Sequence, residues 1–192
     1  MSLSVAVLLG SVRQDRVGLR VARFLLRALE ERGHRPTLVD PMASRLPLLD
    51  RMYKEHPPGE APAVLEELAT LYRGADAFLM VSAEYNHGIP PALKNLLDHF
   101  LEEYFWRPSA IACYSAGSYG GVRAAMQLRM TLAELGMPSI PSLLPFPRAA
   151  ASLDEEGRPL DPAHPPRADR FLDELEWYAE ALRDRRSRGV PY

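Results

Sequence analysis

Apolar residues recur along the chain in two patterns, as short continuous runs and as longer stripes at helical spacing. The runs at residues 3–9, 77–81 and 109–114 show almost no alternation between apolar and polar positions. Strands buried on both faces of a sheet have this pattern. Residues 37–40 form a short further run, and residues 140–144 form a weaker one that Pro141 interrupts. The sequence therefore predicts five strands.

Stripes of apolar residues at i, i+3, i+4 and i+7 follow these runs, and this spacing is typical of helices packed on one face. Glycines 33, 74 and 136 mark the ends of three of them. The predicted helices cover residues 21–29, 62–74, 91–101, 122–135 and 171–182. The Pro-rich segments 41–59 and 150–166 are predicted to be loops, the first lying over the carboxyl edge of the sheet.

Strands and helices thus alternate from the first run to the last. Together with strands that are apolar on both faces, this alternation predicts an α/β fold, a three-layer α/β/α doubly wound parallel sheet. With five strands the flavodoxin-like order 2-1-3-4-5 is expected, in a single domain over residues 1–192. In this order the loops after strands one, three and four meet at one edge, where open α/β sheets bind ligands.

The first of these loops carries Ser11, Arg13, Arg16 and Gly18 directly before a helix. A hydroxyl, two guanidinium groups and free N–H groups at a helix start can bind an anion. The residues alone support a phosphate site and a turn with solvated arginines equally well. Neither G-x-x-x-x-G-K-[ST] nor G-x-G-x-x-G is present, which disfavours nucleotide triphosphate hydrolysis and a dinucleotide-binding fold of the Rossmann type.

The second loop, residues 82–91, lies at the centre of the pattern, and the third, residues 115–121, is rich in glycine. Glu84 and His87 could form an acid–base pair. Since no nucleophile lies nearby in the sequence, we favour a Glu84 that orients the loop and a His87 that contributes its backbone or ring edge. The glycines of the third loop would let the backbone approach a flat ligand.

Bulk composition narrows the function further. A net charge of −2 gives no basic field for nucleic acid, and 47% hydrophobic with 25% charged residues is an ordinary balance. No His, Asp or Glu cluster has metal-ligand spacing, and Cys113, the only cysteine, lies in an apolar run as a buried, inert thiol. Neither a signal peptide nor an apolar stretch of the roughly 20 residues that a membrane span needs is evident, so we expect a cytoplasmic protein without membrane or nucleic-acid partners.

Three motifs together give a family likeness. They are residues 10–16, residues 84–90 followed by Leu93-Lys94-Asn95, and residues 115–121. The chain resembles the NADPH-dependent FMN reductases of the flavodoxin-like superfamily, which include azo-dye, quinone and chromate reductases. The resemblance implies bound FMN, NADPH or NADH as reductant, and a quinone, azo compound, chromate or free flavin as acceptor. It also implies that FMN carries the chemistry, so no catalytic side chain and no metal is expected.

The resemblance further assigns roles to residues of the three loops. Ser11, Arg13 and Arg16, with Gly18 beside them, would hold the FMN phosphate, and the second and third loops would surround the ring. Backbone N–H groups at the start of the helix after Gly120 and Gly121 would stabilise negative charge on the reduced ring. The cofactor-binding residues implied in the second and third loops are Glu84, Tyr85, Asn86, His87, Ser115, Gly117, Ser118 and Gly120.

Two alternatives share the fold. A non-enzymatic electron carrier of the flavodoxin type would bind FMN through a Ser/Thr-rich loop and have a strongly acidic surface, which this chain lacks. A phosphotransfer receiver would need acidic residues after the first and third strands, where Gly10-Ser11 and Ser82-Ala83 stand.

We also expect a homodimer or homotetramer, because the helix 93–101 and the aromatic connector 104–106 offer more apolar surface than one sheet face needs.

Overall fold

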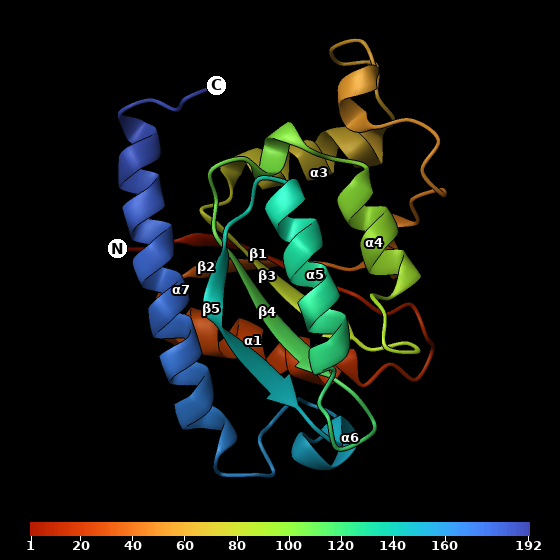
Figure 1. The fold of residues 1–192 in the computed structure, drawn as a ribbon, viewed down its shortest axis with the longest axis vertical. Helices are drawn as coiled ribbons and strands as arrows, with labels where there is room; N and C mark the ends of the chain where they lie inside the picture. Colours follow the sequence, from red (N-terminus) through yellow and green to blue (C-terminus); the bar gives the residue numbers. More distant parts are fainter.

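The computed structural model describes all residues from 1 to 192, and its centre is a five-stranded sheet with helices on both faces (Figure 1). All four neighbouring strand pairs are parallel, and the strand order is β2-β1-β3-β4-β5. The predicted fold class and strand order are confirmed. The strands are β1 (Ser4–Leu9), β2 (Arg35–Val39), β3 (Ala77–Ala83), β4 (Ser109–Tyr114) and β5 (Ser139–Phe146).

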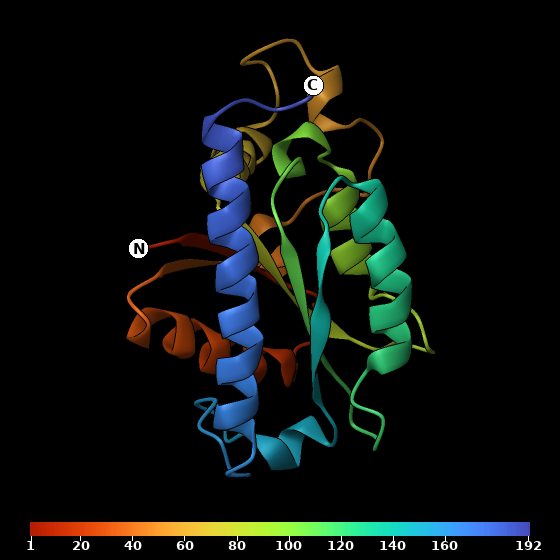
Figure 2. The ribbon, with the colours of Figure 1, turned by 60° about the vertical axis from the view of Figure 1, so that its left-hand side comes forward.

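Helices α1 and α7 cover one face of the sheet, and α3, α4 and α5 cover the other (Figure 2). Alternate residues of β3 supply both layers, with Leu79 and Val81 in one core and Phe78 and Met80 in the other. This two-sided burial explains why the strand sequences lack alternation. The helices are α1 (Gly18–Glu31), α2 (Pro41–Ser44), α3 (Ala63–Gly74), α4 (Pro91–Asp98), α5 (Val122–Glu134), α6 (Ala149–Ser152) and α7 (His164–Ser187), with short 3₁₀ turns η1 (Tyr53–Glu55) and η2 (Glu102–Tyr104).

Strand β5 tolerates Pro141 and Pro145 because it is an edge strand. Side chains of neighbouring helices bind backbone groups of this strand. Arg129 of α5 donates to the carbonyl of Ile140 at 2.9 Å, and Glu174 of α7 accepts a hydrogen bond from the N–H of Ser142 at 3.2 Å. These side chains cover the exposed edge. The strand runs from Ser139 to Phe146, so it is longer at both ends than the predicted 140–144.

The two segments predicted as loops both contain helix. Asp40 caps α2 by accepting the N–H of Met42 at 2.9 Å, and Pro41 occupies the first helical turn. Helix α7 starts at His164, with Pro165 and Pro166 in its first turn, where a missing N–H costs nothing. The prediction of loops from these prolines is therefore wrong at the two helix starts.

Helix α4 ends at Asp98, three residues before the predicted end. The apolar residues that were expected to form a subunit contact are buried within this chain, including Leu93, Phe100 and Tyr104. Phe105 and Trp106 pack against the C-terminal residue Tyr192. The sequence argument for a contact at this surface was therefore wrong.

None of the helices is both long and apolar enough to cross a membrane.

His164, the first residue of α7, is buried against the ring of Phe146, with the ring centroids 4.8 Å apart. Neither ring nitrogen has a hydrogen-bond partner in the protein. Burial lowers the pKa of His164, and Arg167 lowers it further while Asp161 opposes the shift. The folded protein therefore binds this proton less readily than the unfolded chain does.

This difference predicts a pH dependence of stability. His164 favours the folded state fully above its unfolded pKa of about 6.5, and this contribution is lost as the pH falls below that value. In His164→Leu, the free energy of unfolding should fall less between pH 7.5 and pH 5 than in the wild type, as measured by urea titration at each pH. The control His56→Gln removes a histidine that is only partly buried. Equal pH slopes in wild type and His164→Leu would contradict the prediction.

Candidate functional site

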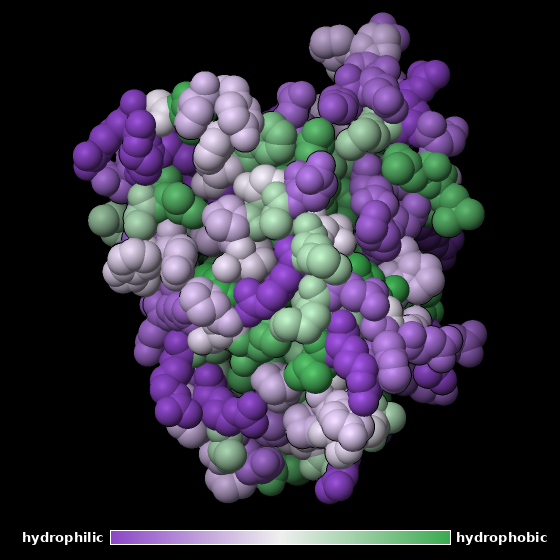
Figure 3. Space-filling model, in the orientation of Figure 1, coloured by the Kyte–Doolittle hydropathy of each residue, from purple (hydrophilic) through white to green (hydrophobic).

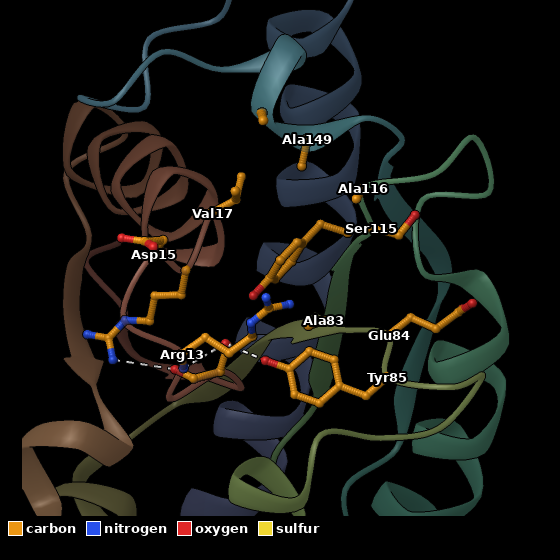
Figure 4. Close-up of a pocket in the computed structure, with 13 residues that line it drawn as sticks. Arg13, Asp15, Val17, Ala83, Glu84, Tyr85, Ser115, Ala116 and Ala149 are labelled. Carbon is orange, nitrogen blue, oxygen red and sulfur yellow. Dashed lines mark hydrogen bonds between the residues drawn. The ribbon is translucent and has the colours of Figure 1, made fainter.

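Loops at the carboxyl ends of β1, β3 and β4 surround a cavity of about 290 Å³ (Figure 4). Residues of the β1–α1 loop line one wall, Ala83, Glu84 and Tyr85 line a second, and Ser115 and Ala116 lie at the third. The start of α6 closes the remaining side. The lining residues are Ser11, Arg13, Asp15, Arg16, Val17, Ala83, Glu84, Tyr85, Tyr114, Ser115, Ala116, Ala149 and Ala150.

A hydrogen bond joins the first loop to the second. The side-chain hydroxyls of Ser11 and Tyr85 lie 2.6 Å apart, and Ser11 is buried. The backbone N–H of Arg13 donates to the same serine oxygen at 3.3 Å. Ser11 therefore shapes its own loop and fixes the phenol of Tyr85 at the cavity wall.

The two arginines of the first loop lie in different surroundings. Arg16 forms an ion pair with Asp40, which follows β2, and its side chain is only 10% exposed. It also donates to the carbonyl of Ser11 at 3.4 Å. Arg13 is exposed and forms no ion pair. Of the two arginines predicted to hold the phosphate with Ser11, Arg13 thus carries the uncompensated charge, whereas Asp40 neutralises the charge of Arg16.

Gly18 opens α1 and has a packing role that its sequence position did not indicate. A Cβ atom at Gly18 would lie 2.2 Å from the hydroxyl oxygen of Tyr114 and 2.6 Å from its Cζ. Any side chain here would displace that tyrosine. Gly18 therefore makes room for Tyr114, the last residue of β4, at the N-terminus of α1.

The second loop turns sharply after Tyr85. Asn86 and His87 have φ values of 49° and 66°, and Tyr85 and Gly88 exchange two backbone hydrogen bonds of 2.9 and 3.1 Å. Asparagine tolerates this left-handed region, whereas histidine adopts it less readily. The side chains of Asn86 and His87 are exposed and do not line the cavity, and the carbonyl of His87 accepts a hydrogen bond from Gln127. Only Glu84 and Tyr85 of this group reach the cavity wall.

Glu84 joins the second loop to the third. Its carboxylate accepts the N–H groups of Arg123 and Ala124, at 3.0 and 3.3 Å, and the guanidinium of Arg123 at 3.1 Å. Burial alone would raise the pKa of Glu84, but these hydrogen bonds and the Arg123 charge together lower it. Glu84 thus caps α5 and orients its loop.

This cap corrects one expectation. N–H groups at the start of α5 were predicted to face the ligand, but those of Arg123 and Ala124 are bound to Glu84. The positive end of the helix is therefore already compensated by a carboxylate.

The third loop contributes less side-chain surface than predicted. Ser115 lines the cavity, and its hydroxyl donates to the carbonyl of Gly117 at 3.1 Å. Gly117, Ser118 and Gly120 do not line it. Gly120 has a φ of 64°, and a Cβ there would lie 3.0 Å from a Pro145 side-chain atom, so its role is to pack the loop against β5.

Residues missed from the sequence include the cavity-lining Asp15 and Tyr114, and the partner residues Asp40 and Arg123. Asp40 follows the end of β2 and Tyr114 is the last residue of β4, so the rule that placed the loops at one edge also applies to them. Tyr114 was counted only as part of a strand. The pairing of Arg123 with Glu84 crosses 39 residues of sequence and left no local signal.

The lining combines the free guanidinium of Arg13 and four hydroxyls with alanine and valine surfaces, and it also includes the carboxylates of Asp15 and Glu84. Such a set fits a ligand with an anionic end and a flat apolar part. Cys113 cannot act as a nucleophile here, because it is buried and burial raises the pKa of its thiol to about 12. No group of three or more His, Cys, Asp or Glu side chains is placed to hold a metal.

Comparisons with known proteins agree with this chemistry. A family model described as NADPH-dependent FMN reductase matches residues 3–151. A quinone reductase from Pseudomonas putida is 31% identical over 180 residues, which cover 88% of this chain and 91% of that protein. A quinone reductase from Escherichia coli is 33% identical over 137 residues, covering 68% and 69% of the two chains.

Solved structures show the same fold. The flavoenzyme NAD(P)H:(acceptor) oxidoreductase FerB from Paracoccus denitrificans superposes with a TM-score of 0.76 at 23% identity, covering 92% of this chain and 98% of that one. A flavodoxin variant from Pseudomonas aeruginosa superposes with a TM-score of 0.55 at 21% identity, covering 94% and 99%.

The Glu84 cap generates a stability prediction. Glu84→Gln should lower the free energy of unfolding by roughly 1–2 kcal/mol, because the amide loses the charge that α5 and Arg123 bind. Since the pKa of Glu84 is lowered in the fold, the difference from wild type should shrink as the pH falls below the unfolded pKa near 4.5. Urea titrations at several pH values measure both effects. An equal loss in Glu67→Gln, an exposed position on α3, would contradict a specific capping role.

Proposed function

Because the chain belongs to the NADPH-dependent FMN reductase family, we propose how its cavity holds FMN and which acceptor the enzyme reduces. The protein is an FMN-dependent NAD(P)H oxidoreductase. FMN, when bound, accepts a hydride from the nicotinamide and passes reducing equivalents to a small-molecule acceptor. The protein's own task is to bind and orient its ligands.

We propose that the phosphate lies at the β1–α1 loop. The observation that carries this assignment is the free charge of Arg13 beside the buried hydroxyl of Ser11, at the start of α1. Arg16 would act less as a charge partner than as a fixed wall, because Asp40 already neutralises it. Gly18 would contribute by admitting Tyr114 to this end of the cavity.

The remaining proposed ligands surround the ring. Tyr85 and Ser115 would line it with side chains, and Glu84 would hold their two loops at a fixed separation. The other predicted ligands of these two loops would contribute through the shape of the loop backbone rather than through side chains in the cavity. They are Asn86, His87, Gly117, Ser118 and Gly120. No acid–base pair is part of this proposal, because hydride transfer requires orientation of the two rings rather than a side-chain proton donor.

For the acceptor we propose a quinone, with azo compounds, chromate and free flavin as further members of the same class. The similar proteins from P. putida and E. coli are named quinone reductases. NADPH and NADH are both proposed reductants. A cytoplasmic location follows from the proposal, since reduced nicotinamide nucleotides are supplied there.

A homodimer or homotetramer also belongs to the proposal, although through a different surface from the one first expected. Met126 and Met130 on α5 are 48% and 70% exposed. The face that includes α5 shows apolar groups along this helix between polar neighbours (Figure 3). Exposed methionines on one helix suit a contact between identical copies.

The function predicts flavin-dependent turnover and a role for charge. Purified protein should bind FMN in a one-to-one complex and oxidise NADPH or NADH when a quinone is added, followed by the absorbance of the reduced nicotinamide.

Arg13→Ala should weaken FMN binding about tenfold or more and flatten its dependence on ionic strength. Flavin fluorescence quenching measures both, with Arg170→Ala on α7 as the matched control. A wild-type protein that binds no FMN would refute the proposed function, and unchanged affinity in Arg13→Ala would refute the phosphate assignment.

Sedimentation at micromolar concentration tests the oligomer. The wild type should sediment as a dimer or tetramer, and Met130→Asp should sediment as a smaller species, because a carboxylate would be buried without a partner. The control Leu160→Asp changes an exposed leucine outside α5. A monomeric wild type would reject the oligomer without affecting the assignment of the cofactor site.

A further inference from the structure

Tyr114 combines burial with a position inside the cofactor cavity. It is the last residue of β4, it is only 6% exposed, and it lines the cavity. Its neighbours in the sheet register are Ala83 of β3 and Phe146 of β5. The ring is therefore held by the central strands rather than by a loop.

The hydroxyl of Tyr114 lies at the first residue of α1. The space that a Cβ atom of Gly18 would occupy is 2.2 Å from this oxygen. Helix α1 has no side-chain cap at Val17 and no acidic residue in its first turn, so nothing in its own sequence compensates its positive end. The phenol is thus a polar group that another element of the fold places at this helix start.

Chemistry limits what the hydroxyl can do there. Burial raises the pKa of Tyr114 to about 12, and its polar neighbours Ser11, the backbone of Gly18 and Arg16 only partly offset this. The group therefore keeps its proton at neutral pH. A phenol has one proton to donate and lone pairs to accept with, so it can accept from a helix N–H and donate to an anion. A hydroxyl that accepts such a bond becomes a stronger donor.

The hydroxyl of Tyr85 has a different position. It lies 2.6 Å from the Ser11 oxygen, so one of these two hydroxyls donates to the other and Tyr85 is engaged by Ser11. Within the lining, Tyr114 supplies the phenol at the helix start and Arg13 supplies the free cation.

We propose that Tyr114 is a specificity-determining binding residue, whose neutral hydroxyl donates a hydrogen bond to the FMN phosphate and makes the site select FMN over riboflavin. The inference deepens the proposed function and rests on it. It assigns the phosphate two kinds of partner, an ionic one in Arg13 and an uncharged one in Tyr114. It also explains why residue 18 has no side chain, since a larger residue would move the donor away from the helix start.

The test compares flavin affinities of the protein freed of cofactor. Tyr114→Phe removes one oxygen and keeps the ring, and it should weaken FMN binding about tenfold or more. Riboflavin affinity should stay unchanged, so the ratio of the two affinities should fall by the same factor. Because the lost donor is uncharged, the ionic-strength dependence of FMN binding should match the wild type, in contrast to Arg13→Ala. Fluorescence quenching reports every one of these affinities without turnover.

Tyr192→Phe is the control, since this exposed tyrosine packs against Phe105 and Trp106 and does not line the cavity. Thermal unfolding checks that the variants fold, and Tyr114→Met offers a second side chain without a donor should phenylalanine disturb the core. An unchanged affinity ratio in these variants would overturn the inference, as would an equal loss of riboflavin and FMN, which indicates a packing role. A wild type that binds neither flavin would instead refute the proposed function itself.

Discussion

The candidate site depends on hydrogen bonds that join its three loops to one another through the second loop. Tyr85 binds Ser11 of the first loop, and the neighbouring Glu84 binds the start of α5 after the third. Adjacent residues of an extended chain point to opposite sides, so one short segment reaches both neighbours. The parallel register brings the strand ends together, but these bonds fix the distances between the loops. A cavity held in this way is organised before a ligand enters, which reduces the entropy lost on binding.

The same bonds decide which charges remain available. Two positive groups near the cavity are compensated within the protein, Arg16 by Asp40 and the start of α5 by Glu84. Arg16, Asp40 and Glu84 are largely buried, so leaving any of these charges without its partner would be costly, and the two pairs are structural. Arg13 keeps its charge because no carboxylate pairs with it. An anion is thereby directed to one end of the cavity, although arginines are frequent in the sequence.

The sequence was sufficient for the architecture because the architecture depends on local patterns. Continuous apolar runs placed three strands, shorter or interrupted runs placed the two edge strands, and Gly33, Gly74 and Gly136 marked three helix ends within a few residues. The site depends on contacts between residues distant in sequence, and these patterns do not encode such contacts. The ion pair between Arg16 and Asp40 and the close approach of Tyr114 to Gly18 became visible only in three dimensions. Proline was ambiguous for a related reason, since it ends a helix at one position and begins one at another, as Pro41 and Pro165 do.

The lining of the cavity also bears on how selective the enzyme can be. Discrimination between acceptors of similar size requires buried polar groups that an incorrect substrate leaves unpaired. Here several polar groups have partners within the protein, as Ser11 has in Tyr85 and Glu84 has in Arg123, and Arg13 lies where the phosphate is proposed to bind. Much of the remaining wall is alanine and valine, which recognise shape and apolar surface but little else. On the proposed function, such a site would bind FMN through specific contacts and the acceptor through general ones, so we expect the range of acceptors to depend on access to the cavity and on reduction potential more than on hydrogen-bonded recognition.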